Sequence, residues 1–335
     1  MNYTKIFLPL LIVYSSFLSS CNAQTTPENN SLNLIATIQL PNVSGRIDHL
    51  TFDNKYKILF VAALGNNTVE VVDLKNKKVI HTIKNLSEPQ GLAFIPEKNS
   101  LFVANGANGE CDVFNATTFQ KTASMNLGDD ADNVRYDAIN KRIYVGYASG
   151  GIAVVDATTF KIISQIKLSG HPESFQLDKS ANKIYVNVPD EHQIEIIDLT
   201  KNVVVDKWIM TEAKSNFPMA LDETNHRLFI GCRHPAKLLV IDTQTGKTIS
   251  SLNIDSDTDD IFYSSTNKKL YVSCGGGYIN VFTQLDANSY KTNGKVETRS
   301  GARTSLFIQE LNQLIVASPA TLTRKAALLI YNTKF

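Results

Sequence analysis

The chain has 335 residues, of which 43% are hydrophobic and 19% charged, and its 33 Lys and Arg residues nearly balance its 32 Asp and Glu residues. This composition is typical of a folded globular protein and excludes a low-complexity chain. Nucleic-acid binding needs a concentrated basic patch, and no run of Lys or Arg supplies one, so we expect no nucleic-acid partner.

The first predicted element is a secretory signal peptide over residues 1–20. Lys5 gives a positive start, and the apolar stretch 6–18 is too short to span a bilayer. The stretch ends in Leu18, Ser19, Ser20 and Cys21, which resembles the lipobox of bacterial lipoproteins. That resemblance implies lipid attachment at Cys21.

A polar segment follows, and residues 21–31 are predicted to form a flexible tether between lipid and globule. By the same resemblance, the absence of Asp directly after Cys21, where Asn22 stands, favours outer-membrane sorting. The expected location is therefore the cell envelope, with the protein held at a membrane by its N-terminal lipid on the periplasmic or surface face.

Residues 32–335 contain a phrase that recurs seven times at spacings of 41 to 44 residues. Each copy has an apolar strand, a loop, a second apolar strand and a turn. The first of these strands begins at Leu59, Leu101, Ile143, Ile184, Leu228, Leu270 and Leu314. Short Val, Ile, Phe and Tyr runs broken by turns every eight to twelve residues or so indicate four-stranded propeller blades rather than helical repeats. We predict an all-β, seven-bladed β-propeller in a single domain.

The seventh copy ends at Phe335, directly after its third strand, so its outermost strand is missing. The segment 34–40 precedes the first full blade and aligns with the outer strand 79–85 of that blade. We therefore expect the N-terminal strand to complete the last blade, which closes the ring and removes an open sheet edge.

Turn chemistry explains most of the regularly spaced polar residues. An Asn ahead of most middle strands tolerates left-handed backbone angles, and an Asp at the end of the next strand accepts hydrogen bonds from its own turn. The Asn residues are Asn99, Asn140, Asn182, Asn225, Asn267 and Asn312, and the Asp residues are Asp73, Asp156, Asp198 and Asp242. The triple glycine from Gly275 to Gly277 precedes a strand and not a helix, so it is predicted to be a hairpin loop rather than a phosphate cradle.

Three cysteines remain after Cys21. Cys232 and Cys274 occupy equivalent positions in neighbouring repeats, where the separation between blades exceeds the limit of about 7 Å for a disulfide, and we expect free buried thiols. No spacing resembles a zinc or haem site.

The most informative charge pattern lies in the loops that lead into the innermost strands. Aligning the repeats gives a first ring, Asp48, Gln90, Asp132, Glu173, Phe217, Asp259 and Arg303, and a second ring two residues earlier, Arg46, Glu88, Asp130, His171, Ser215, Asp257 and Gly301. Propellers usually bind ligands at this mouth of the channel. Seven carboxylates thus gather there with two arginines and a histidine. A ligand-binding site is predicted here at Arg46, Asp48, Glu88, Gln90, Asp130, Asp132, Glu173, Asp257, Asp259 and Arg303.

Two accounts of this cluster stay open. Loops exposed to water collect charge without any function. Alternatively, the carboxylates bind a divalent cation, with Asp48, Asp132, Glu173 and Asp259 as the candidate metal ligands, or a cationic or hydroxyl-rich molecule. His171 and His49 are then weak candidates for a general base.

Stretches such as "HPESFQLDKSANKIYVNVPDEHQIEIIDL", which begins at His171, resemble the YVTN-type repeat of extracytoplasmic bacterial β-propellers. The resemblance covers essentially residues 34–335 and implies the fold, whereas such propellers bind proteins, glycans or metals, and related ones are lactonases or lyases. We favour a monomeric binding or interaction scaffold whose partner is a protein, a small molecule or a glycan. The alternative is a metal-dependent lactonase-like hydrolase or lyase. Lengthened loops near residues 283–298 and 318–325 are further candidates for specificity.

Overall fold

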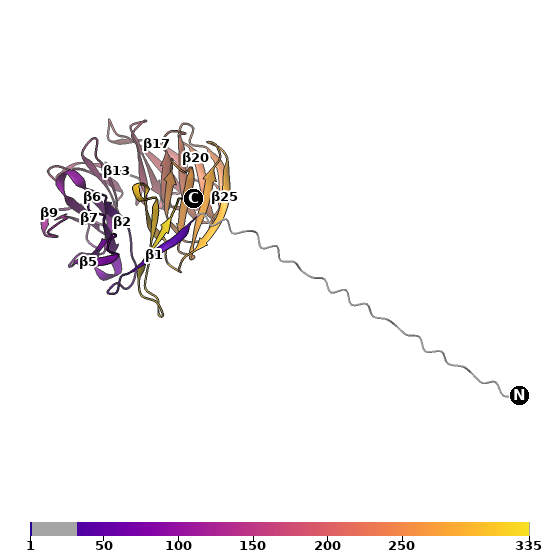
Figure 1. Ribbon diagram of the computed structural model, residues 1–335. Helices are drawn as coiled ribbons and strands as arrows, with labels where there is room; N and C mark the ends of the chain where they lie inside the picture. Colours follow the sequence, from indigo (N-terminus) through magenta and orange to yellow (C-terminus); the bar gives the residue numbers. More distant parts are fainter. Residues whose placement is uncertain (2–31, 335) are drawn as a thin grey trace.

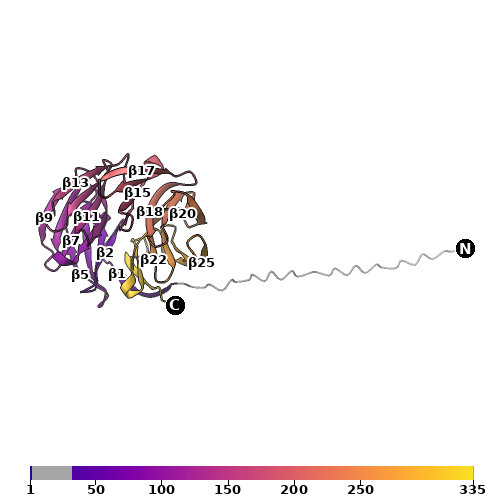
Figure 2. The same ribbon diagram turned by 90° about the horizontal axis from the view of Figure 1, so that it is seen from above.

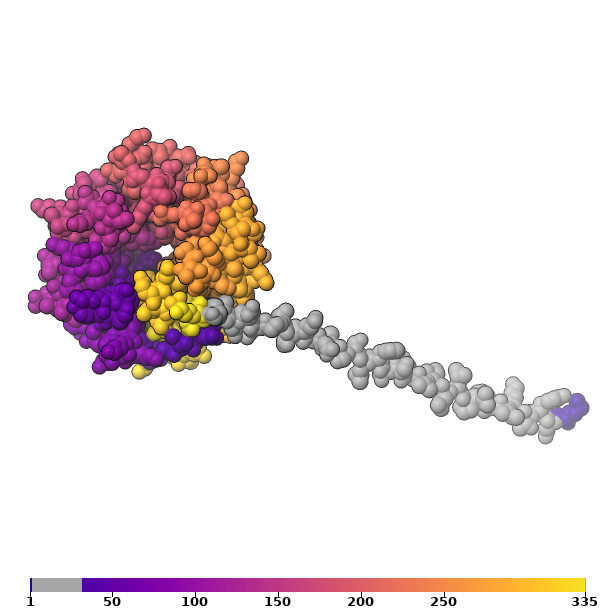
Figure 3. All heavy atoms as spheres, turned by 45° about the horizontal axis from the view of Figure 1, so that its top comes forward, coloured from indigo at the N-terminus to yellow at the C-terminus, as the bar shows by residue number. Residues whose placement is uncertain are grey.

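The computed structural model describes Met1 and residues 32–334, and these form seven four-stranded antiparallel sheets arranged around a central channel (Figures 1 and 2). The space-filling view shows the ring of blades and its central opening (Figure 3). The predicted all-β, seven-bladed propeller is confirmed. Apart from Met1, the predicted signal peptide, the Cys21 lipid site and the tether lie outside the described residues, so these stay predictions.

Each blade contributes one strand to each of four positions counted outward from the channel. The innermost strands are β2 (Leu50–Asp53), β6 (Pro89–Ile95), β10 (Ala131–Asp137), β14 (Phe175–Asp178), β18 (Lys214–Asp222), β22 (Thr258–Ser264) and β26 (Thr304–Ile308). The second strands are β3 (Ile58–Ala63), β7 (Ser100–Asn105), β11 (Arg142–Tyr147), β15 (Lys183–Val188), β19 (Arg227–His234), β23 (Lys269–Cys274) and β27 (Gln313–Ser318). The third strands are β4 (Thr68–Asp73), β8 (Glu110–Asn115), β12 (Gly151–Asp156), β16 (Gln193–Asp198), β20 (Ala236–Asp242), β24 (Tyr278–Gln284) and β28 (Ala327–Asn332).

The outermost strands are β5 (Lys78–Ile83), β9 (Lys121–Asn126), β13 (Ile162–Lys167), β17 (Val203–Ile209), β21 (Thr248–Asn253), β25 (Tyr290–Glu297) and β1 (Asn33–Gln39). The helices of the described chain are single 3-10 turns, η1 (Leu64–Asn66), η2 (Pro96–Lys98), η3 (Pro189–Glu191) and η4 (Gln309–Leu311). Within the residues described, no helix has the length and apolar character that crossing a membrane requires.

The second and third strands read as continuous apolar runs because both faces of each sheet are covered by neighbouring blades. In β3, for example, Leu59, Phe60 and Val61 are all fully buried, although successive residues of a strand point to opposite faces. The outermost strands consist mainly of exposed and half-buried residues. The core is therefore a ring of apolar layers between blades rather than one central cluster.

Strand β1 pairs antiparallel with β28, and Leu34 lies opposite Tyr331 while Ile38 lies opposite Leu328. Beyond the strand, the Leu40 backbone N–H donates to the Ala326 carbonyl at 2.8 Å. The first strand of the described chain thus completes the last blade, as the repeat count predicted.

The residue directly before each second strand has a positive φ in all seven blades. These residues are Lys57, Asn99, Lys141, Asn182, His226, Lys268 and Asn312. The prediction that Asn takes the left-handed position is right for three blades and wrong for Asn140, Asn225 and Asn267, where the following residue takes it. In two of these exceptions the Asn side chain instead donates to the Asp that ends the innermost strand, at 2.7 Å from Asn140 to Asp137 and from Asn225 to Asp222.

The Asp turns form as predicted, since Asp156 Oδ1 accepts from the backbone N–H groups of Thr158 and Thr159, both at 2.9 Å. Cys111, Cys232 and Cys274 are free and buried. Burial in apolar surroundings raises the pKa of all three thiols, so they are packing residues.

Candidate functional site

The loops that lead into the innermost strands enclose a cavity of about 180 Å³ at the channel mouth, which we call the mouth cavity. Its lining residues are Arg46, Gln90, Asp130, Asp132, His171, Glu173, Phe217, Arg233, Asp259 and Arg303. All but Arg233 belong to the two rings derived from the repeat alignment. The alignment therefore identified residues that are distant in sequence and meet in space.

A much smaller cavity of about 20 Å³, the inner pocket, shares several of these walls. It is lined by Arg46, Asp48, His49, Asp132, Asn133, Glu173, Ser174, Phe217 and Asp259. A protein cavity needs roughly 10–15 Å³ to hold one water-sized group, so the inner pocket has room for one.

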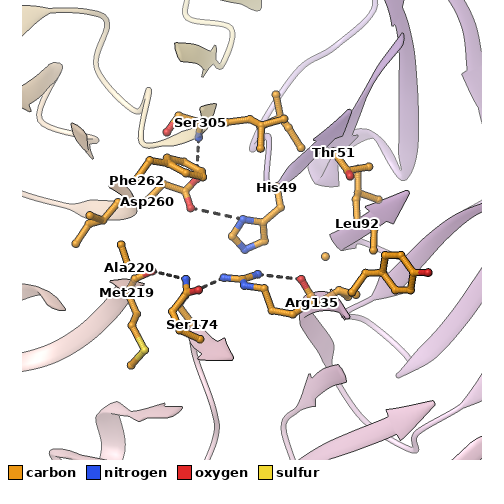
Figure 4. A pocket seen from close by; sticks show the side chains of 18 of the residues that line it. His49, Thr51, Leu92, Arg135, Ser174, Met219, Ala220, Asp260, Phe262 and Ser305 are labelled. Atoms are coloured by element: carbon orange, nitrogen blue, oxygen red, sulfur yellow. Dashed lines mark hydrogen bonds and ion pairs between the residues drawn. The ribbon is translucent and has the colours of Figure 1, made fainter. Parts of the chain in front are cut away.

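The channel itself contains a third cavity of about 390 Å³, lined by the innermost strands. His49 and Ser174 line both this channel cavity and the inner pocket, so they separate the two. Figure 4 shows the His49 ring extending into the channel cavity, with Asp260 and Arg135 among its neighbours. Asp260 accepts from the Ser305 backbone N–H at 2.7 Å, and Arg135 Nη2 donates to Ser174 Oγ at 3.1 Å.

One side of the mouth is neutralised by arginines. Arg233 Nη2 lies 2.6 Å from Asp259 Oδ1, and Arg303 Nε lies 3.0 Å from Asp259 Oδ2. Arg303 also pairs with Asp257 at 2.9 Å. The Arg233 guanidinium stacks over the Phe217 ring at 3.8 Å from its centroid. These contacts fix the arginines at the wall formed by blades five to seven.

The opposite side, formed by blades three and four, keeps its carboxylates without an arginine at ion-pair distance among the described residues. Asp132 lies 3.9 Å from His49 Nε2, and Glu173 lies 3.8 Å from His171 Nε2. Asp132 Oδ1 and Asn133 Oδ1 are buried and find no hydrogen-bond partner within the described chain. The mouth is therefore divided into a paired basic side and an unpaired acidic side.

Burial and mutual repulsion shift the protonation of this acidic side. Burial, with the neighbouring charges of Asp48 and Glu173, raises the pKa of Asp132 well above its usual range. Burial and the charge of Asp259 raise the pKa of Glu173 to about 8. Burial, followed by the adjacent Arg135, lowers the pKa of His49 to about 4, so this imidazole is neutral at neutral pH.

Three further buried carboxyls near the channel have pKa values that shift in the same direction. Burial raises the pKa of Asp48, Asp259 and, most strongly, Asp260. With a pKa of about 8, Glu173 holds a proton at neutral pH that an ordinary Glu residue would have lost.

Backbone conformation helps to position four members of the second ring. Glu88, Ser215, Asp257 and Gly301 all have positive φ. In blade six the triple glycine makes room for this geometry, because a side chain on Gly275 would collide with the Asp257 carboxylate. The Gly275 N–H donates to the Asp257 carbonyl at 2.7 Å. The triple glycine is a hairpin turn, as predicted.

Not every predicted ligand-binding residue lines these cavities. Glu88 is exposed and contributes to none of the three, and Asp257 contributes only through its ion pairs with arginines that line the mouth. The candidate metal ligands Asp48, Asp132, Glu173 and Asp259 do share the inner pocket. Among the described residues, however, no three His, Cys, Asp or Glu side chains are grouped so as to hold a metal ion. The divalent-cation site stays a prediction.

Sequence reasoning missed five residues of the site, Arg135, Asn133, Ser174, Arg233 and Asp260. Three of them directly follow a member of the first ring, so a pair of consecutive polar residues was the available signal. In a regular strand, the second residue of each pair would point to the opposite face from the first. Register shifts between Ala131 and Val134 and between Thr258 and Asp260 change this alternation of side chains.

The two lengthened loops have different surroundings. The blade-six loop packs back on blade five, where Arg227 Nη2 donates to Asn288 Oδ1 at 2.7 Å. The blade-seven loop, through Thr321, Thr323 and Arg324, lines a surface cavity of about 340 Å³ beside the triple-glycine turn.

No protein-family model matches this chain, and no curated protein matches its sequence. Solved structures do match its fold. One is described as Kuenenia stuttgartiensis hydrazine synthase, with a TM-score of 0.75, 15% identity, and coverage of 87% of this chain and 98% of that chain. Another is a chain in a crystal structure of the mitotic checkpoint complex, with a TM-score of 0.75, 13% identity and coverage of 99% of both chains. At such identity the likeness concerns the fold alone. The molecule is a seven-bladed β-propeller with a charged channel mouth.

Proposed function

We propose that this propeller is a binding protein that takes a small polar ligand at the channel mouth. The observation that carries the proposal is Asp132, which is only 7% exposed and lines both the mouth cavity and the inner pocket. Its Oδ1 has no hydrogen-bond partner among the described residues. An unpaired buried carboxylate oxygen costs stability unless another group pairs with it, and a hydrogen-bond-donating ligand can be that group.

The paired arginines support a binding role as well. Arg233 and Arg303 are held by Asp259, so they form a rigid wall opposite the unpaired carboxylates. A site of this kind is preorganised, because the side chains that contact the ligand lose little freedom when it binds. The location at the mouth, where all seven blades contribute residues, also agrees with the usual ligand position in propellers.

A thermal-shift screen on the purified full chain tests this proposal, with sugars, polyols, amino acids, amines and divalent cations as candidate ligands. At least one compound class should raise the melting temperature of the wild type, because a ligand that binds only the folded state stabilises it. The same compound should lose most of its effect on Asp132→Asn. The proposal fails when no stabilisation depends on Asp132.

An enzymatic role is the second candidate, and one observation favours it. Glu173 lines both cavities and has a pKa raised to about 8 by burial and by the charge of Asp259, a value suited to proton transfer near neutral pH. Lactone hydrolysis by the wild type, lost in Glu173→Gln, would support it. An absence of turnover with and without added calcium, magnesium, manganese or zinc would remove it.

The membrane anchor is also part of the proposal. The lipobox-like stretch ending at Cys21 supports lipid attachment and a position at the cell envelope, probed by incorporation of a labelled fatty acid. Labelling that persists in Cys21→Ser would contradict the anchor.

A further inference from the structure

The inner pocket has more carboxyl groups than basic groups in its lining. It is lined by one guanidinium and by four carboxylates, those of Asp48, Asp132, Glu173 and Asp259. We infer that the inner pocket binds the ammonium group of a small primary amine, whose alkyl body lies in the mouth cavity. This inference rests on the proposed function and specifies its ligand class.

The argument begins with the two buried oxygens. Asp132 is 7% exposed and Asn133 is 3% exposed, and the Oδ1 atom of each has no hydrogen-bond partner among the described residues. The amide oxygen of Asn133 is an acceptor, and Asp132 Oδ1 is one when that carboxyl is ionised, so the group that satisfies both must be a donor. An ammonium group has three N–H donors, and the Glu173 carboxylate at the junction of the two cavities is available for the third.

The charge of the pocket carboxyls favours an ammonium group over a neutral hydrogen-bond donor as the ligand. The arginines are already engaged, since Arg46 Nη2 lies 2.8 Å from Asp48 Oδ2 and both Arg233 and Arg303 contact Asp259. Asp132 and Glu173 are the carboxylates left without such a counter-charge. A buried carboxylate is stable when it is both paired and hydrogen-bonded, and an ammonium group does both.

The volumes of the two cavities restrict the class of ligand further. A volume of about 20 Å³ admits one water-sized group, which fits –NH₃⁺ and excludes a guanidinium or a trimethylammonium group. The mouth cavity of about 180 Å³ is smaller than the roughly 300–1,000 Å³ of drug-sized sites, so the amine is small. Phe217, the apolar member of the first ring, lines both cavities and offers a surface for the alkyl chain.

The protonation of the acidic side gives the inference a pH dependence. The charged and titratable groups around Asp132 and Glu173 are Arg46, Asp48 and His49 ahead of β2, Asp130 and Arg135 from the β10 segment, His171 ahead of β14, Arg233 on β19, Asp257, Asp259 and Asp260 from the β22 segment, and Arg303 ahead of β26. Burial and the neighbouring carboxylates raise the pKa of Glu173 to about 8. An ammonium group favours the ionised carboxylate, so binding below about pH 8 releases protons.

Isothermal titration calorimetry on the purified full chain tests the inference, in a buffer free of primary amines and of phosphate, because phosphate precipitates calcium. The probes are butylammonium, butyltrimethylammonium, butan-1-ol and calcium chloride. Butylammonium should bind at least tenfold more tightly than butyltrimethylammonium or butan-1-ol. Its affinity should rise between pH 6 and pH 8, and comparison with a second amine-free buffer of different ionisation heat should show proton release.

Variants locate the binding. Asp132→Asn keeps the size of the side chain but removes its charge, and it should weaken butylammonium binding at least tenfold. Asp129→Asn is the matched control, because Asp129 is exposed, lies three residues before Asp132 in the loop that leads into β10, and lines none of the three cavities. It should bind butylammonium like the wild type. Equal melting curves without ligand would show that both variants are folded.

Four outcomes overturn the inference. Equal affinity for butylammonium and butyltrimethylammonium would show that the pocket does not recognise N–H donors. Binding of calcium alone would assign the pocket to a metal ion. Asp132-dependent binding of butan-1-ol or of a sugar, without amine binding, would disprove the ammonium class and leave the proposed function standing, whereas no Asp132-dependent binding of any kind would remove both.

Discussion

Asp132 and Glu173 lie in one wall of the mouth, and each has only a histidine at ion-pair distance among the described residues. Asp259, across the cavity, has two arginines. A buried carboxyl group therefore has different consequences in the two walls. On the paired side it rigidifies the mouth, whereas on the unpaired side it holds a proton that a ligand can displace.

The unpaired carboxyls should make stability depend on pH. Burial and the charge of Asp259 raise the pKa of Glu173 to about 8, above the unfolded value of about 4.3, so the folded state binds the proton more tightly. Stability should then fall as the pH rises from about 4 to about 8. Glu173→Gln removes this loss, and we expect a melting temperature about 2–5 °C above the wild type at pH 9 but within about 1 °C of it at pH 5.

Thermal unfolding at both pH values, with Asp129→Asn as an exposed control, measures this effect. A Glu173→Gln variant that is no more stable than the wild type at pH 9 would show that the carboxyl is compensated in the folded state.

At the level of single elements, the turn into each second strand has the same backbone conformation at its last residue in all seven blades. The residue before the strand has a positive φ, and Asn fills this position in three blades whereas Lys or His fills it in four. Left-handed backbone angles cost a residue with a Cβ atom roughly 1–2 kcal/mol. The cost is smaller for Asn, because its short polar side chain hydrogen-bonds to the nearby backbone.

Lys141 offers a test of this cost, since it is exposed and has a φ of 52°. Lys141→Asn places the residue used at Asn99, Asn182 and Asn312 in the equivalent position. We expect a gain of about 0.5 kcal/mol in the free energy of unfolding, measured by chemical denaturation. Asn182→Val, which places a β-branched residue at a φ of 54°, should lose at least about 1 kcal/mol. A loss of stability in Lys141→Asn or a gain in Asn182→Val would contradict this account of the turn.

The elements also show what the sequence could and could not predict. The period of the apolar runs predicted blades, strand order and the first ring, because equivalent positions in a repeat occupy equivalent places in the fold. It did not predict that Lys141, rather than Asn140, would have the left-handed backbone angles. A shift of one residue within the turn leaves the pattern of apolar runs unchanged. The remaining residues of the site depended on register shifts in β10 and β22 and on Arg233 from strand β19, which the alignment of the entry loops does not contain.

At the scale of the whole molecule, closure of the ring depends on one strand from the opposite end of the chain. In β1 the Ile38 side chain is 1% exposed and belongs to the apolar layer between the last and first blades, together with Leu40 and Leu328. Without β1, the backbone groups of β28 would form an open edge that can pair with another chain. Removal of residues 32–41 should therefore lower the melting temperature sharply and promote aggregation, measured by thermal unfolding and size-exclusion chromatography.

A pair of substitutions in β1 separates closure from a general effect of changing the N-terminus. Ile38→Ala opens a cavity in the layer between blades and should cost about 2–5 kcal/mol. Ile35→Ala, three residues away on the same strand, removes a side chain that is 49% exposed and should cost less than about 1 kcal/mol. Because both changes remove the same atoms, their difference measures burial against the first and last blades. Equal, small losses in the two variants would mean that β1 lies on the last blade without holding the ring shut.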